Sequence, residues 1–355
     1  MAFRQAVAQA WPPFVLVAGL LLVGLAAHAE GAFEWAATRL ERFASGSIRL
    51  FAFSCGAVAL VTAVLNLDTA VVFLTPVLVL AARQRELDER PFLYAAVFMA
   101  NASSLFLPGS NLTNLLVLGQ EPVSGATFAA RLLAPASAAT LTTACGLLFL
   151  WRRKLAGARQ RPAHAHAPPR QQVSPFALTV VALAATLTLV LHDPAVWVLC
   201  VGLLAGAWEL LRGRMSVLEM YRGLGAPVLL ALFFFSVALG LLARQWAWPA
   251  HLVGHAGRSA TTAIAAVAAV SVNNLPAALL LSARTVAHPQ ALLLGLNLGP
   301  NIAVTGSLSA YLWYRAAQQT GTQPSIRQFT RHGVLLAPAA MLTALLAITL
   351  LSSPS

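Results

Sequence analysis

The stretch VTAVLNLDTAVVFLTP, residues 61–76, places Asn66, Asp68 and Thr69 in the middle of an apolar run. Apolar residues extend on both sides, from 50 to 82, and Asp68 is the one charge within that interval. A charge at the centre of a bilayer costs roughly 2.5–3.5 kcal/mol on insertion scales, so such residues usually mark ion or proton paths. An Asp can also cap the start of a half-helix at a hairpin tip. The two roles are compatible, and both predict that this turn lies at a functional site.

A second stretch, VAAVSVNNLPAALLLS at 267–282, parallels the first one in the other half of the chain. Asn273, Asn274 and Pro276 interrupt this stretch at the point that matches Asn66 and Asp68 in the first one. Asn and Pro interrupt a helix, and the backbone groups they free are tolerated in a membrane only when buried in protein or facing a wet cavity. A packing or kink role for this turn is the alternative interpretation.

Two further apolar runs are interrupted by polar residues and helix breakers, PGSNLTN at 108–114 and LGPNIAVTGS at 298–307. N-termini of half-helices offer N–H groups to anions or neutral oxygens, whereas C-termini and loose carbonyl groups suit cations. Hydroxyl and amide side chains also join helices in membranes without binding a solute. Asn101, Ser103 and Ser104 are weaker candidates. The candidate binding residues in the two runs are Ser110, Asn111, Thr113, Asn301, Thr305 and Ser307.

The composition is that of an all-α polytopic membrane protein. Of 355 residues, 59% are hydrophobic and 10% are charged, against about 25% charged residues in soluble domains. Several apolar runs reach the roughly 20 residues that a transmembrane helix needs. The net charge of +12 is best explained by basic loops on the cytoplasmic side of an inner membrane, next to anionic lipid, rather than by a nucleic-acid partner.

Motifs of enzymes are missing from the sequence. The single lysine, Lys154, is followed by Leu155, so a Walker A motif is excluded and the chain is not itself an ATPase. Cys55, Cys145 and Cys200 are far apart and give no metal-ligand pattern. We therefore expect no enzyme activity, no cofactor and no metal site.

The interrupted runs recur in the same order in both halves, which predicts two repeats. The first repeat covers 1–151, with a hairpin at 50–82 and a broken helix at 91–118. The second covers 175–355, with a hairpin at 259–287 and a broken helix at 290–314. A basic cytoplasmic linker, 152–174, joins them, and a basic loop is expected at 212–225. Counting spans from the linker makes the two hairpins re-entrant from opposite faces, an inverted symmetry typical of secondary transporters. Residues 50–82 could instead form a bent span and a second short one, and 14–29 has some features of a signal peptide.

Four segments resemble the arsenical pump membrane subunit (ArsB-type) family of the ion-transporter superfamily. They are LNLDTAVVFLTPVLVLAAR (65–83), PFLYAAVFMANASSLFLPGSNLTNLLVLG (91–119), VNNLPAALLLS (272–282) and GLNLGPNIAVTGSLSAYLW (295–313). The resemblance implies inverted repeats around a central site and export of arsenite or antimonite across the cell inner membrane. It implies a coupling proton or a separate ATPase subunit as partner, with a homodimer as the assembly. It places the residues named above at the hairpin tips and helix breaks.

Two features depart from the family's pattern. The first repeat has one span before its hairpin where the second has three (176–191, 195–211 and 226–243), so we expect an N-terminally shortened first repeat. The hairpin reads Asn-Leu-Asp, and Leu67 removes one polar group from the tip. The leading hypothesis is arsenite export by proton antiport. The alternatives are a carrier of the same fold for another solute, by sodium/proton exchange or anion/dicarboxylate transport, and a non-transporting, channel-like membrane subunit.

Overall fold

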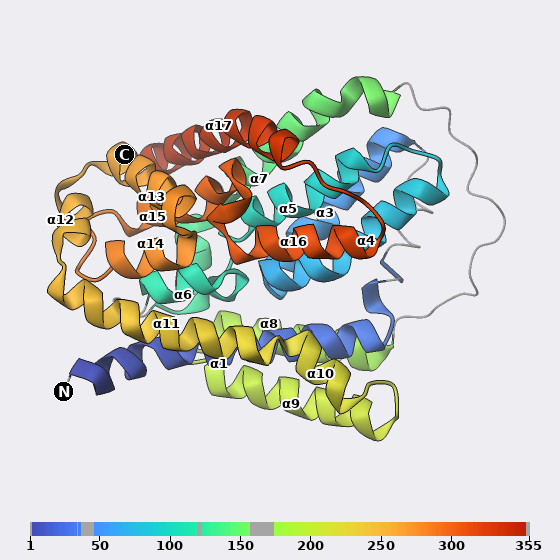
Figure 1. Ribbon diagram of the computed structural model, residues 1–355, viewed down its shortest axis with the longest axis horizontal. Helices are drawn as coiled ribbons and strands as arrows, with labels where there is room; N and C mark the ends of the chain where they lie inside the picture. Colours follow the sequence, from blue (N-terminus) through green and yellow to red (C-terminus); the bar gives the residue numbers. More distant parts are fainter. Residues whose placement is uncertain (1, 34, 37–45, 119–122, 157–173, 353–355) are drawn as a thin grey trace.

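The computed structural model describes residues 2–33, 35–36, 46–118, 123–156 and 174–352 (Figure 1). Within these ranges every regular element is helical, as the composition predicts. Most of the expected linker 152–174 lies outside the described residues.

Along the chain, the first half consists of a long helix, a helical hairpin, an interrupted helix and a second long helix. Helix α1 begins at Ala2, well before the apolar run at 14–29, and the helix breaks at 65–66 and 104–111 fall within residues 50–82 and 91–118. The elements are α1 (Ala2–Ala29), α3 (Ser47–Val64), α4 (Leu67–Gln84), α5 (Arg90–Ser103), η1 (Pro108–Ser110), α6 (Leu112–Leu118) and α7 (Gly125–Ala156).

The second half repeats this order after four additional helices, α8 to α11, and the short α12. Its first elements are α8 (Pro175–Val190), α9 (Ala195–Leu211), α10 (Val217–Leu224), α11 (Ala226–Gln245) and α12 (Trp248–His255). The hairpin and the interrupted helix follow as α13 (Arg258–Val272), α14 (Asn274–Leu281), α15 (Pro289–Leu298), η2 (Gly299–Ile302), η3 (Val304–Gly306) and α16 (Leu308–Gln319), and the described chain ends with α17 (Ile326–Ser352).

Helix α10 corrects the expectation of a plain loop at 212–225. Ser216 and Glu219 form a capping box, in which the Ser216 Oγ accepts from the Glu219 N–H at 3.1 Å and the Glu219 Oε2 accepts from the Ser216 N–H at 2.7 Å. Gly225, at φ 61°, ends the helix in the left-handed region that favours glycine. Val217, Met220, Tyr221 and Leu224 recur at helical spacing, but eight residues are too few to stand out as a membrane span, which explains why the hydropathy pattern misses this helix.

Six stretches in the described part of the chain are long and apolar enough to cross a membrane. They are Ala10–Ala29, Ser47–Val64, Leu67–Gln84, Gly125–Ala156, Val217–Gln245 and Ile326–Leu351. The chain is therefore a multi-pass membrane protein.

The helices form two groups (Figure 1). Helices α1, α8, α9, α10 and α11 lie together along one side, and the hairpins and interrupted helices fill the other. Within the first group α1 crosses α9 at glycines: a Cβ added to Gly202 would lie 2.6 Å from the carbonyl oxygen of Gly19. Small residues allow such close backbone approach between membrane helices.

The second group interlaces the two halves. Helix α4 packs against α16, α6 against α14, and α7 runs along α17. The Thr142 and Thr343 hydroxyls join α7 to α17 at 2.9 Å, and the Trp313 Nε1–H of α16 donates to the carbonyl of Leu93 in α5 at 2.8 Å. Each hairpin packs against its own half, α3 and α4 on α5 and α13 on α15, and the contacts of α4 with α16 and of α6 with α14 add surface from the other half.

The open ends of the two hairpins lie at opposite ends of the molecule. Near the end of α4, Arg83 donates to the carbonyl oxygen of Thr320 after α16, while Thr262 near the start of α13 donates to that of Ala291 in α15. At the first of these ends Asp88 binds Arg90 and Lys154. Partial burial alone would raise the pKa of Asp88, but these hydrogen bonds outweigh it and lower the pKa to about 2. Because the open ends of the hairpins lie at opposite ends of the molecule, both hairpin tips point into its middle.

Candidate functional site

A cavity of about 480 Å³ lies between the two hairpin tips and the two helix breaks. Its wall is formed by the first turns of α4, α6, α14 and α16, by η3, and by Leu232 and Phe235 of α11. Seven of the predicted binding residues line it: Asp68, Asn111, Thr113, Asn273, Asn274, Thr305 and Ser307. The fold thus brings together residues that are more than two hundred positions apart in the sequence.

The four helices that begin at the cavity are each capped by a predicted residue. The side chain of Asn66 accepts from the N–H of Thr69 at 2.7 Å, and that of Asn111 from Thr113 at 3.0 Å. In the second half, Asn273 accepts from the N–H of Leu275 at 3.3 Å and Ser307 from that of Ala310 at 3.2 Å. The capping role considered for the tip belongs to Asn66 rather than to Asp68. Asp68, two residues after the cap, lines the cavity.

Each hairpin tip is also tied to the helix break of its own half. The Ser110 hydroxyl of η1 donates to the carbonyl oxygen of Ala63, near the end of α3, at 3.1 Å. The Asn273 amide donates to the carbonyl oxygen of Thr305, in η3, at 3.1 Å. These contacts satisfy backbone groups that the breaks leave without a helical partner. Ser110 is fully buried and acts in this tie rather than in the wall of the cavity.

Asn66, Thr69 and Asn301 also lie behind the cavity wall. The Asn66 amide nitrogen and the Thr69 hydroxyl are buried and have no hydrogen-bond partner among the described residues. Asn301 accepts from the Asn101 amide at 2.8 Å and donates to the carbonyl oxygen of Phe98 at 3.3 Å. These residues hold the tip and the break in place, one step away from the cavity.

Asn297, which is not among the predicted binding residues, lies near the end of α15 and is completely buried. Its Oδ1 accepts from the Ser104 hydroxyl and from the Asn111 amide, both at 2.6 Å. Its amide nitrogen donates to Asn114 Oδ1 and to the carbonyl oxygen of Leu293, both at 2.8 Å. An Asn in the otherwise apolar run LLLGLNLGP was the sequence signal for this residue.

Asn273 has an unusual backbone, with φ 78° and ψ 148°. This conformation is close to a region that is almost restricted to glycine and costs other residues about 1–3 kcal/mol. The strain falls at the second hairpin tip, where the bond to Thr305 and the cap of α14 compensate for it.

The electrostatics of the cavity are simple. Asp68 is the one ionisable carboxyl group among its lining residues, which include no Lys, Arg or His. Asp68 has no ion-pair partner among the described residues. The positive ends of four helix dipoles point at the same space. The cavity can therefore hold an oxygen-rich solute by hydrogen bonds, with one carboxyl group able to bind a proton or a cation.

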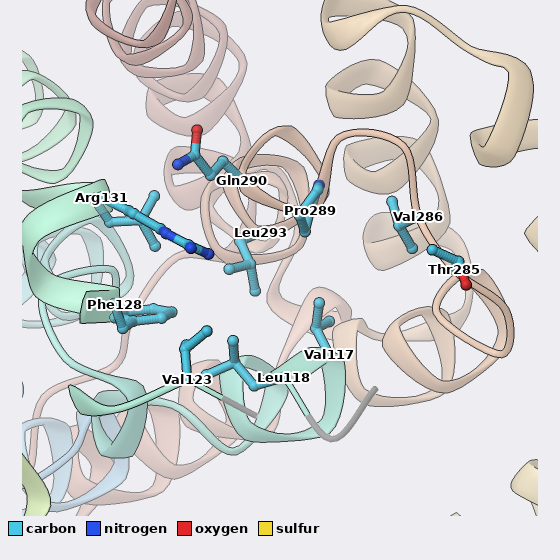
Figure 2. Close-up of a pocket in the computed structure, with 11 residues that line it drawn as sticks. Val117, Leu118, Val123, Phe128, Arg131, Thr285, Val286, Pro289, Gln290 and Leu293 are labelled. Atoms are coloured by element: carbon cyan, nitrogen blue, oxygen red, sulfur yellow. The ribbon is translucent and has the colours of Figure 1, made fainter. Parts of the chain in front are cut away.

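A smaller hollow of about 90 Å³ lies between α6, α7 and α15 (Figure 2). Its wall is mostly apolar, and Figure 2 shows the Arg131 side chain reaching across it toward Leu293. None of the predicted binding residues line it, so the candidate site is the larger cavity.

Comparisons with known proteins agree with this fold. The family described as citrate transporter (CitMHS) matches residues 4–305. Arsenical pump membrane proteins of Yersinia enterocolitica and of Escherichia coli (strain K12) are each 25% identical over 380 residues, covering 96% of this chain and 86% of theirs. A putative arsenical pump membrane protein of Bacillus subtilis (strain 168) is 32% identical over 108 residues, 29% of this chain and 24% of that protein. The structure of the YdaH transporter of Alcanivorax borkumensis has a TM-score of 0.63 over 99% of this chain and 87% of that one, at 15% identity, which bears on the fold alone.

Apolar helices, helix breaks that meet at a central cavity, and these likenesses to transporters define a multi-pass membrane transporter. The chain belongs to the citrate-transporter (CitMHS) family, and it is a transporter of the type that includes the arsenical pump membrane proteins.

Proposed function

We propose that this protein exports arsenite or antimonite across the inner membrane in exchange for protons. The observation that carries the proposal is a cavity lined by amide and hydroxyl groups with Asp68 as its one carboxyl group. The names of the relatives similar over 96% of the chain support the choice of solute.

The chemistry of the solute suits the cavity. Arsenite at neutral pH is an uncharged trihydroxide, so its oxygens need hydrogen-bond donors and acceptors rather than a counter-charge. Asn111, Thr113 and Asn274 present such groups from two different halves of the chain. Asp68 would be the coupling group: a protonated carboxyl group is cheap to bury, whereas an ionised one needs water or a cation. Loading of a proton would therefore change which states of the carrier are accessible.

The transport proposal includes an arrangement in the membrane. The two hairpins, 50–82 and 259–287, would be re-entrant and enter from opposite faces, as parts of two inverted repeats, 1–151 and 175–355. Support comes from the hairpin ends, which lie at opposite ends of the molecule, and from the matching order of caps and ties in the two halves. The proposed cytoplasmic linker is 152–174.

The test is arsenite uptake into everted membrane vesicles that contain the protein, energised by a proton gradient, with Asp68→Asn in parallel. We expect accumulation by the wild type and none by the variant, because Asn cannot release a proton. Uptake that persists in the variant but stops at equal concentrations on both sides of the membrane would favour a channel-like route over proton coupling. No accumulation above empty vesicles, with folded and inserted protein, would exclude arsenite as the solute.

A second candidate is an anionic solute such as a carboxylate. It is favoured by the four helix N-termini that face the cavity and by the description of the family as citrate transporters. The absence of Arg and Lys from the cavity wall counts against it. Uptake of labelled citrate into the same vesicles, with and without sodium, would separate the two candidates.

A further inference from the structure

The side-chain amide of Asn297 uses all of its ordinary hydrogen-bonding capacity. Two donors, the Ser104 hydroxyl and the Asn111 amide, share its Oδ1 at 2.6 Å. Its two N–H groups are taken by Asn114 Oδ1 and by the carbonyl oxygen of Leu293 at 2.8 Å. Asn297 comes from the second half, whereas Ser104, Asn111 and Asn114 belong to the first. One buried side chain therefore joins both interrupted helices.

The bond to Asn111 reaches the cavity. Asn111 is 4% exposed, lines the cavity, and caps α6 by accepting from the N–H of Thr113 at 3.0 Å. An Asn side chain that caps with its oxygen can rotate unless its nitrogen is also held. Asn297 supplies the acceptor for that nitrogen, so it fixes both the rotamer of Asn111 and the position of the first turn of α6.

The second bond system makes the anchor rigid. The Asn114 amide nitrogen, one turn along α6, donates to the carbonyl oxygen of Ser104 at 2.6 Å and to that of Leu107 at 3.3 Å. Asn114 therefore holds the loop between α5 and α6 closed while its Oδ1 binds Asn297. A fully satisfied buried network of this kind specifies one arrangement, because any group that loses its partner is left buried without a hydrogen bond.

We propose that Asn297 is a positioning residue for solute binding, which orients Asn111 and the first turn of α6 across the boundary between the two halves. It does not touch the cavity and acts through Asn111. The kinetic test of this role rests on the proposed transport function, whereas the cysteine-labelling test rests on the structure alone.

The kinetic test is a double-mutant cycle in the vesicle assay with Asn297→Ala, Asn111→Ala and the double variant. We expect Asn297→Ala to raise the KM for arsenite about tenfold, the effect of losing one well-made hydrogen bond, with little change in the maximal rate. In the Asn111→Ala background the second change should add little to KM, because its effect has already been lost. KM effects that simply multiply, or an unchanged KM in Asn297→Ala, would overturn the proposal.

Ser103→Ala is the matched control. Ser103 is fully buried at the end of α5, and its hydroxyl has no hydrogen-bond partner among the described residues. Its removal should leave KM unchanged, and a rise equal to that of Asn297→Ala would mean that any polar loss at this level acts alike, against the proposal. Should Asn297→Ala fail to fold, Asn114→Ala removes one partner of Asn297 and should raise KM by a smaller factor.

The second readout needs no transported solute. A cysteine is placed at Thr113, in the first turn of α6, in a chain whose Cys55, Cys145 and Cys200 are replaced. Maleimide labelling of this cysteine should become severalfold faster with Asn297→Ala and stay unchanged with Ser103→Ala. An unchanged labelling rate in Asn297→Ala would overturn the positioning role. If the wild type accumulates no arsenite, the transport proposal fails while this measurement still decides the role of Asn297.

Discussion

At the scale of single residues, the polar groups in the membrane are mainly divided between capping and facing the cavity. Asn66 and Asp68 stand two positions apart, yet one caps α4 from behind the wall and the other lines the cavity. Local sequence could predict that both belong to the tip, since Asn and Asp interrupt an apolar run. It could not assign the roles, because these depend on which side of a backbone turn faces the empty space.

Asn273 gives a prediction about backbone strain. Asn273→Ala and Asn273→Gly both lose the cap of α14 and the bond to Thr305, but only alanine keeps the strain of a positive φ. We expect the glycine variant to be the more stable one by about 1 kcal/mol, the reverse of the usual order in helices. Thermal unfolding of the purified variants in detergent measures this. A more stable alanine variant would show that the tip relaxes to an ordinary conformation.

At the scale of elements, the helix breaks in the structure fall at Asn, Pro and Gly residues that interrupt apolar runs, so local chemistry indicates where these helices stop. The polar hub escaped prediction for a physical reason. Asn297 pairs with Ser104 and Asn111, about 190 residues earlier, and a single sequence contains no signal of which amides meet. Asn101 and Ser104 looked like weak site candidates because a residue that binds another helix has the same polarity as one that binds a solute.

The crossing of α1 and α9 gives a prediction about helix packing. Gly202→Ala would bring a Cβ to 2.6 Å from the Gly19 carbonyl oxygen, whereas a Cβ on Gly56 in α3 would meet no atom within 4 Å. We expect Gly202→Ala to destabilise the protein by about 1–3 kcal/mol through overpacking. Gly56→Ala should be neutral or stabilising by up to about 1 kcal/mol. Melting temperatures of the two variants make the comparison, and equal values would mean that α1 and α9 separate easily.

At the scale of the whole molecule, the two halves share one packed core rather than forming two units side by side. The pairs α4 with α16, α6 with α14 and α7 with α17 all cross from one half to the other. The sequence indicated two repeats. In the structure each half has one hydrogen bond that joins its hairpin tip to its helix break. The interlacing itself was beyond prediction, because equally apolar helices can pack within a half or across halves.

A disulfide can test the crossing contacts. The Thr142 and Thr343 hydroxyls are 2.9 Å apart, so cysteines at both positions, in a chain without the three native ones, should form a disulfide on mild oxidation. Cleavage of the chain between residues 156 and 174 should then leave both pieces in one band on a non-reducing gel and separate them after reduction. Either single cysteine gives the baseline. Separate bands without reduction would contradict the contact between α7 and α17.

Because the two halves interlace, some groups of the first half are synthesised well before their partners in the second half. The Leu93 carbonyl and the Asn101 amide receive their partners from Trp313 and Asn301, 220 and 200 residues later. At about 5–20 residues per second, the ribosome needs roughly 10–40 s to supply them. During that interval the Asn101 side-chain amide of α5 lacks the acceptor that it has in the folded protein, whereas the Leu93 carbonyl can still bond within its own helix. The nascent chain therefore depends on water or on the insertion machinery to shelter this amide, and anything that slows translation of the second half prolongs its exposure.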